Sequence, residues 1–121
     1  MVRNNQNERL VLWLGRSLKD TRGFPEDVQD VLGHNLSEVQ RGAMPGTAKP
    51  LPEYGPGVYE LGQDYAGDTY RLIFLLGLAK GVYVLHAFLK KSKSGRGHPR
   101  PDKDVIRQRM RDAQEYDATQ R

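Results

Sequence analysis

The sequence contains no cysteine, and this absence excludes several kinds of chemistry. Disulfides, thiolate metal sites and cysteine nucleophiles all require a thiol. Long apolar runs are missing as well, since the longest one, Leu72 to Leu89, is interrupted by two glycines, a lysine and a histidine. A membrane-spanning helix needs about 20 mainly apolar residues. The first ten residues are polar and lack the apolar region of a signal peptide, so we expect a soluble, cytoplasmic protein.

The chain is also short, and its length limits the number of domains. Its 121 residues match the usual size of one domain, and a domain this small folds around a thin core. We therefore expect a single domain over residues 1–121, with flexible tails at 1–8 and 117–121. Such a core leaves little room for a large cofactor, and none is expected.

Positive charge is concentrated in the C-terminal part of the chain. The formal net charge is +4, but residues 90–111 alone contain nine lysines and arginines against two aspartates. A block of this kind indicates a phosphate-bearing or acidic partner. The alternative is a solvated, charged tail with no partner.

Periodicity predicts the order of helices and strands. An apolar segment at 9–14 predicts an edge strand or the start of the core, and helical spacing between Pro25 and Gly42 predicts a helix. Proline and glycine make residues 42–57 a loop. Runs at 58–64, 70–76 and 82–89 predict an antiparallel meander, and an apolar stripe within 101–116 predicts a last helix. The expected fold class is α+β, with a three- to four-stranded antiparallel sheet.

A histidine lies in the last predicted strand. Strict alternation along that strand places five side chains on one face: Val82, Val84, His86, Phe88 and Lys90. Histidine titrates near neutral pH, so His86 is a candidate for proton transfer. The alternative is a packed, hydrogen-bonded histidine without a catalytic role.

Arg71 is the most informative single residue. It lies in the central apolar strand, where a charge needs a partner or a function. It either forms an ion pair with Glu60 on the neighbouring strand or holds a phosphate with its planar donor fork.

Two groups of basic residues follow the strands. Lys90, Lys91 and Lys93 either protect the edge of the sheet or begin a basic track that includes Arg96 and the last helix. On that helix Lys103, Arg107 and Arg111 are spaced four residues apart. Like charges at this spacing destabilise a helix, so an anionic partner explains the stripe better than helix stability does.

Several short motifs occur in an order found in one known family. Residues 57–61 read GVYEL, 67–71 read GDTYR, 83–88 read YVLHAF and 90–93 read KKSK, and Pro99 and Arg109 match the closing proline and arginine of that family. Together with matching segments near Trp13, Phe24 and Gln40, these motifs resemble the phage-derived HigB/RelE-like toxins of type II toxin–antitoxin systems, within the RelE/ParE superfamily. The resemblance extends from about residue 9 to residue 112.

The resemblance implies a fold and an activity. The fold would be RelE/ParE-like, with N-terminal helices packed on the antiparallel sheet and a basic C-terminal helix. The activity would be that of a metal-independent, ribosome-dependent mRNA endonuclease that uses the RNA 2′-hydroxyl as nucleophile. The partners would be the ribosome, mRNA and a helix-turn-helix antitoxin, bound in a hetero-oligomer, with no membrane involved.

The resemblance also implies roles for individual residues. Arg71 and Lys90 would stabilise the phosphate charge, His86 would transfer a proton, and Glu60 would hold Arg71 in place. The following residues would contact RNA or the ribosome: Lys91, Lys93, Arg96, Lys103, Arg107, Arg109 and Arg111.

The sequence departs from the family pattern at three places. Phe74 stands where relatives often have tyrosine, Leu89 replaces a usual glutamine, and His98 replaces a usual threonine. The same superfamily includes gyrase poisons, which bind a protein and catalyse nothing, so a non-catalytic toxin or binding module is the alternative function. A nuclease requires Arg71 and Lys90 to face one groove.

Overall fold

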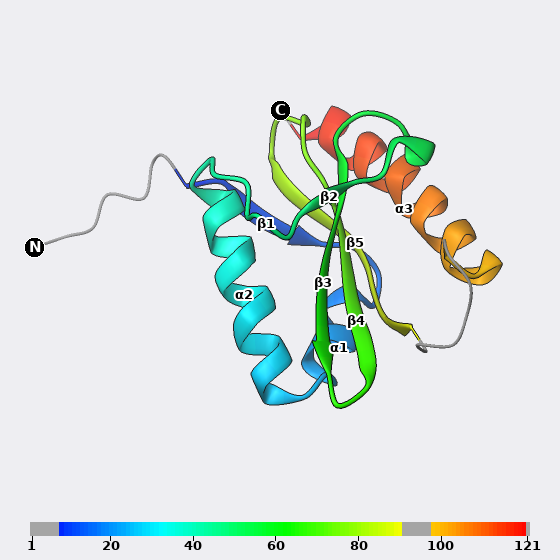
Figure 1. The fold of residues 1–121 in the computed structure, drawn as a ribbon. Helices are drawn as coiled ribbons and strands as arrows, with labels where there is room; N and C mark the ends of the chain where they lie inside the picture. The colour runs from blue at the N-terminus through cyan, green and yellow to red at the C-terminus, as the bar shows by residue number, and fades with distance from the viewer. Residues whose placement is uncertain (1–7, 91–97, 121) are drawn as a thin grey trace, which may run out of the picture.

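The apolar runs of the sequence form the strands of one sheet in the computed structural model, which describes residues 8–90 and 98–120 (Figure 1). The strand order is β1-β5-β4-β3-β2. The strands are β1 (Leu10–Trp13), β2 (Lys49–Pro50), β3 (Val58–Tyr65), β4 (Asp68–Leu75) and β5 (Gly81–Lys90). The predicted meander is confirmed, because β3, β4 and β5 pair antiparallel in that order. Ala66 and Gly67 both have positive φ, as a two-residue hairpin turn requires.

The sheet is larger and less regular than the sequence predicted. It has five strands and is mixed, whereas three or four antiparallel strands were expected. β1 pairs with β5 in parallel, since no hairpin connects these distant segments and their direction is not fixed by a turn. β2 adds a two-residue edge to β3 inside the region predicted as a loop.

Helices cover both faces of this sheet, as the two sides of the ribbon show (Figure 1). α1 (Ser17–Arg22) and α2 (Glu26–Gln40) lie on one face, and α3 (Arg100–Thr119) lies on the other. A short 3-10 helix, η1 (Pro52–Tyr54), connects β2 to the start of β3. Of the helices in the described part of the chain, none has the length and apolar character that a membrane crossing requires.

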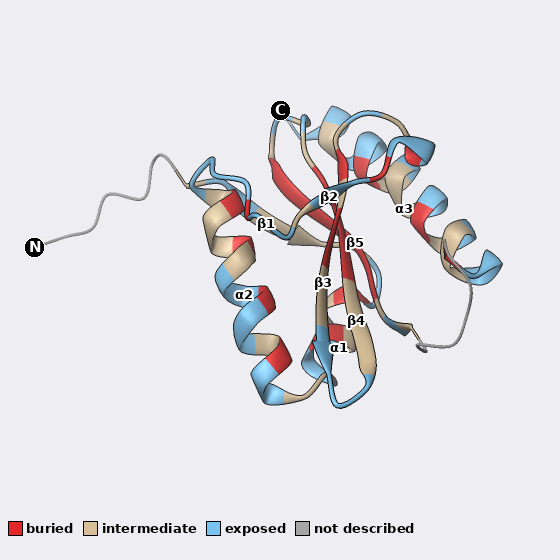
Figure 2. Cartoon of the chain, viewed as in Figure 1, coloured by how far each residue is buried: buried red, intermediate tan, exposed pale blue. Residues whose placement is uncertain are grey.

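The core lies on both sides of the central strand β4. Leu72 and Phe74 pack toward α2, and Ile73 and Leu75 pack toward α3. Figure 2 shows this pattern as buried residues along the middle of the strands and on the inner sides of the helices. Burying one such side chain stabilises the fold by about 1.5–3 kcal/mol. The prediction that this run forms a central strand is therefore confirmed.

The last helix is longer than predicted. It continues to Thr119, so Asp117, which we expected in a flexible tail, is part of α3. The Asp117 carboxylate accepts hydrogen bonds from the backbone N–H groups of Ala79 and Lys80 and from the Tyr83 hydroxyl. These bonds fix the end of α3 against the start of β5.

A β-bulge in β5 changes which side chains share a face. Ile73 pairs with His86 and Phe74 pairs with Val84, so Leu85 is an extra residue without a partner of its own. The prediction that Val84 and His86 lie on the same face is therefore wrong. Bulges redirect side chains and are common next to active sites. After the bulge, the side chains of His86, Phe88 and Lys90 lie on the α3 face of the sheet.

Candidate functional site

The pair formed by Glu60 and Arg71 is the centre of the candidate site. Glu60 lies opposite Ile73 in the β3–β4 register, and Arg71 is two residues from Ile73, so both side chains lie on the α3 face. Nη1 of Arg71 donates a hydrogen bond to Oε2 of Glu60. The Glu60 side chain is only 4% exposed and that of Arg71 20% exposed. The ion pair that the sequence left open is thus present, and the exposed part of the Arg71 side chain remains available for a further role, whereas its Nε is buried without a hydrogen-bond partner.

His98 and Tyr54 extend this pair into a chain of polar groups. Nε2 of His98 lies 2.8 Å from Oε1 of Glu60, and Nδ1 of His98 lies 2.7 Å from the Tyr54 hydroxyl. His98 immediately precedes Pro99, the N-cap residue of α3, and Tyr54 ends η1. The two rings stack with centroids 5.8 Å apart. Segments far apart in the sequence therefore meet around one buried carboxylate.

Burial affects the charge states of these groups. Burial and the nearby charge of Arg71 lower the pKa of His98, so its ring is neutral near neutral pH. Burial, followed by the charge of Glu53, raises the pKa of Tyr54 to about 12 and keeps its hydroxyl protonated. Burial also lowers the pKa of Arg71, but a guanidinium stays charged at any physiological pH.

Lys90 completes the site from the end of β5. It lines a cavity of about 430 Å³, within the range of about 300–1,000 Å³ that is typical of ligand sites. The pKa of Lys90 is lowered by burial and by the charges of Arg71 and Lys49. The lining residues are Lys49, Pro50, Leu51, Pro52, Glu53, Glu60, Arg71, Lys90 and His98. Three cationic side chains therefore face a space that also contains two carboxylates, an arrangement suited to one phosphate group.

His86 does not belong to this cavity. Its Nε2 lies 2.7 Å from Oδ1 of Asp102 in the first turn of α3, and its ring stacks on Phe88. It lines a different hollow, next to α1 residues such as Lys19. Of the three predicted catalytic residues, the structure brings Arg71 and Lys90 together and places His86 elsewhere, where it links α3 to the sheet.

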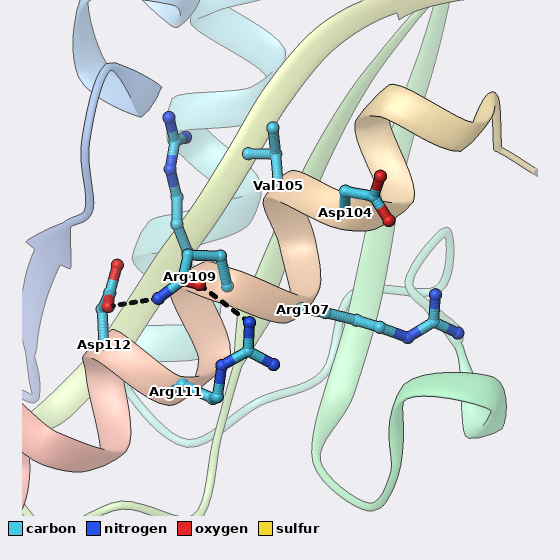
Figure 3. Close-up of a pocket in the computed structure, with 7 residues that line it drawn as sticks. Asp104, Val105, Arg107, Arg109, Arg111 and Asp112 are labelled. Carbon is cyan, nitrogen blue, oxygen red and sulfur yellow. Dashed lines mark hydrogen bonds between the residues drawn. The ribbon is translucent and has the colours of Figure 1, made fainter.

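The basic residues of α3 divide into two groups. Arg107 and Arg111 are exposed and line a hollow of about 620 Å³ on the outer side of the helix, together with Arg109 and the carboxylates of Asp104 and Asp112 (Figure 3). Arg107 also lies over the Tyr54 ring, 5.2 Å from its centroid. Lys103 lines a smaller hollow beside Arg107.

Arg109 has a different environment. Its Nη1 donates a hydrogen bond of 2.9 Å to the backbone carbonyl of Leu85, the extra residue of the bulge. Its guanidinium also packs against Gly15, where a Cβ atom would lie 2.6 Å from it. This geometry gives Arg109 a packing role, which the sequence did not indicate. The predicted contacts Lys91, Lys93 and Arg96 lie outside the described residues.

Sequence reasoning missed three residues of the site: Lys49, Tyr54 and His98. Two of them lie in the proline- and glycine-rich segment, where no periodicity assigns a side chain to a face. His98 was noted only as a departure from the family pattern. Its position beside Glu60 depends on how α3 packs, which no local pattern encodes. Among the described residues, no group of three or more acidic or histidine side chains is arranged to hold a metal ion.

Comparisons with known proteins identify the family and the fold of the chain. The family model for phage-derived Gp49-like proteins matches residues 19–111. The chain is similar in structure to an arginine-to-alanine double mutant of the Escherichia coli toxin RelE in the free state, with a TM-score of 0.57 and 19% sequence identity. That similarity covers 87% of this chain and 97% of the RelE chain. No curated protein has a sequence that matches significantly. The predicted RelE-like fold is thereby confirmed.

Proposed function

Because the chain belongs to the Gp49-like family of phage-derived proteins and has a RelE-like fold, we propose that it is a toxin that cleaves mRNA on the ribosome. The observation that carries this proposal is the shared cavity of Arg71 and Lys90, which a nuclease of this kind requires and a non-catalytic toxin does not. The β-bulge supports it further, since it places Lys90 on the same face as Arg71.

The proposed reaction needs no metal and no nucleophile from the protein. The 2′-oxygen of the RNA gives its proton to water and attacks the adjacent phosphorus to form a 2′,3′-cyclic phosphate, while the bond to the 5′-oxygen breaks and that oxygen gains a proton. Arg71 stabilises the negative charge that builds up on the phosphate oxygens. Lys90, with its lowered pKa, is the group in the cavity best suited to protonate the leaving oxygen. DNA lacks the 2′-hydroxyl and is not cut.

The ribosome contributes orientation in this scheme. Arg71, Lys90 and Lys49 supply charge that attracts any phosphate, so they do not by themselves align one particular bond for attack. A ribosome holds mRNA along a fixed path, and such alignment can be worth about 7–11 kcal/mol of the barrier. The basic outer face of α3, with Arg107 and Arg111, is available for ribosomal RNA.

The same proposal includes a protein partner. A toxin of this type acts in the cytoplasm and is neutralised by a co-expressed helix-turn-helix antitoxin in a hetero-oligomer. We place the antitoxin on the outer face of α3, because Arg107 and Arg111 offer a basic surface that an acidic segment can cover. Antitoxin and RNA would then compete for that surface.

The test compares three proteins in a translation extract: the wild type, Arg71→Ala and the control Arg41→Ala, whose exposed arginine lies at the end of α2. We expect the wild type and Arg41→Ala to cleave mRNA in the presence of ribosomes and not as purified RNA. Arg71→Ala should be slower by about 10²–10³-fold. Cleavage of purified RNA as fast as that of ribosome-bound mRNA would show that the ribosome is not required. DNA damage without loss of mRNA would favour a gyrase poison.

A further inference from the structure

Four polar side chains form a continuous chain of hydrogen bonds beneath the cavity. The chain begins at the Tyr54 hydroxyl, passes through His98 and Glu60, and ends at Arg71. For a neutral His98 ring, one assignment of donors and acceptors satisfies every hydrogen bond in it. The neutral His98 ring places a proton on Nε2, because that atom faces a carboxylate, and leaves a lone pair on Nδ1 to accept from Tyr54. Reversing the tautomer would direct a lone pair at the Glu60 oxygen.

His98 itself is not placed to exchange protons with a substrate. Its side chain is only 4% exposed, and both ring nitrogens are occupied by protein partners. Its influence on the cavity must therefore pass through Glu60. That carboxylate has one oxygen bound to His98 and the other bound to Arg71, so it cannot rotate without losing both bonds.

We propose that His98 is a positioning residue that fixes the Glu60 carboxylate, which in turn holds the Arg71 guanidinium in the orientation that binds the phosphate. This inference rests on the proposed function and adds to it a residue outside the motifs that carried the resemblance. Without His98, the buried Glu60 carboxylate would lose one hydrogen-bond partner and could rotate. The Arg71 guanidinium would then no longer be held in one orientation. Groups that orient a functional side chain typically contribute about 10–100-fold to activity.

The direct experiment is a double-mutant cycle between His98 and Arg71, measured as single-turnover cleavage of ribosome-bound mRNA. We expect His98→Ala to lower the maximal single-turnover rate by about 10–100-fold, with little change in the toxin concentration that gives half of that rate, and to have no further effect in the Arg71→Ala background. His34→Ala is the matched control, since His34 is an exposed histidine on α2. Equal effects of His98→Ala in both backgrounds would overturn the proposal. An unchanged rate for Arg71→Ala alone would instead overturn the proposed function.

Two further variants separate positioning from folding. His98→Gln offers an amide that can donate to Glu60 and accept from Tyr54, so it should regain most of the activity lost in His98→Ala. Tyr54→Phe keeps the ring against His98 but removes the hydroxyl that bonds to Nδ1, and it should lower the single-turnover rate by roughly fivefold. If His98→Ala does not fold, either of two results would overturn the proposal: a folded His98→Gln that cleaves no mRNA, or a Tyr54→Phe effect that is equal in the wild-type and Arg71→Ala backgrounds.

A spectroscopic measurement tests the same chain without any reaction. The ¹⁵N chemical shifts of the His98 ring should show a neutral imidazole protonated on Nε2 near neutral pH, and Tyr54→Phe should keep that tautomer, because the Glu60 carboxylate still faces Nε2. A ring protonated on Nδ1, or charged at that pH, would contradict the inferred direction of the hydrogen bonds.

Discussion

Arg109 gives the sharpest test of how the bulge in β5 is held in place. Its guanidinium donates to the carbonyl of Leu85 and packs against Gly15, whose φ of +54° is in the left-handed region. Arg109→Ala removes a charged donor from the carbonyl of the bulge residue. A hydrogen bond to a charged group contributes about 1.5–3 kcal/mol, so we expect a loss of about 2 kcal/mol in the free energy of unfolding.

Gly15→Ala should act partly through the same bond. A left-handed backbone costs a non-glycine residue about 1–2 kcal/mol, and the new methyl group would lie 2.6 Å from the Arg109 guanidinium. The end of a flexible side chain can move away, but doing so breaks its bond to Leu85. In the Arg109→Ala background only the backbone strain remains, so the double variant should be more stable than the sum of the single effects predicts, by about 2 kcal/mol.

Chemical denaturation of the four proteins measures this coupling. Arg109→Ala should also lower the Tm by roughly 8 °C, taking about 4 °C per kcal/mol for a domain of this size. Arg111→Ala is the control, because Arg111 is exposed on the same helix and bonds only to Gln108 among the described residues. Its effect should stay within about 0.5 kcal/mol. Additive costs for Gly15→Ala and Arg109→Ala would refute the role assigned to Arg109.

Three more predictions follow from other parts of the structure. Lys90→Gln should fold normally and lose about 10²–10³-fold in cleavage rate, which single-turnover assays measure. Burial alone would raise the pKa of Asp117, but hydrogen bonds from Lys80, Tyr83 and Ala79 outweigh it and lower that pKa. The Asp117 carboxylate therefore stabilises the fold above about pH 4, and this stabilisation is lost as the pH falls further. The Tm advantage of the wild type over Asp117→Asn should shrink between pH 5 and pH 3. Reversing Arg107 and Arg111 to glutamate should weaken antitoxin binding and reduce its salt dependence. Binding titrations at two salt concentrations measure this, and equal antitoxin affinities for the wild type and the double variant would contradict it.

Much of the fold could be predicted because the informative patterns are local. The helical spacing that begins after Pro25, the turn at Ala66 and Gly67, and the apolar run of β4 all express short-range rules. The parallel pairing of β1 with β5 joins segments some 70 residues apart, and nothing in either segment specifies the other. The α+β class was therefore predictable, whereas the full strand count was not.

The site was predictable only where a residue was conspicuous within its own strand. Arg71 is a charge in an apolar strand, and the structure places it at the centre of the cavity with Lys90. Val82 and Val84 were wrongly predicted to share a face with His86, because strict alternation assumes no bulge and Leu85 breaks the alternation one residue before His86. His98 could not be identified because its partners, Glu60 and Tyr54, are brought to it by the packing of α3 and η1.

The central claim is that this cavity directs attack by the 2′-hydroxyl of ribosome-bound mRNA. The most direct measurement uses an mRNA with a single 2′-deoxynucleotide at a mapped cleavage position, programmed into ribosomes and treated with the wild-type protein. We predict that cleavage at that position disappears, while unmodified mRNA is cut there and ends in a 2′,3′-cyclic phosphate. Cleavage that persists at the deoxynucleotide would contradict the account, because the nucleophile would then have to come from water or from the protein.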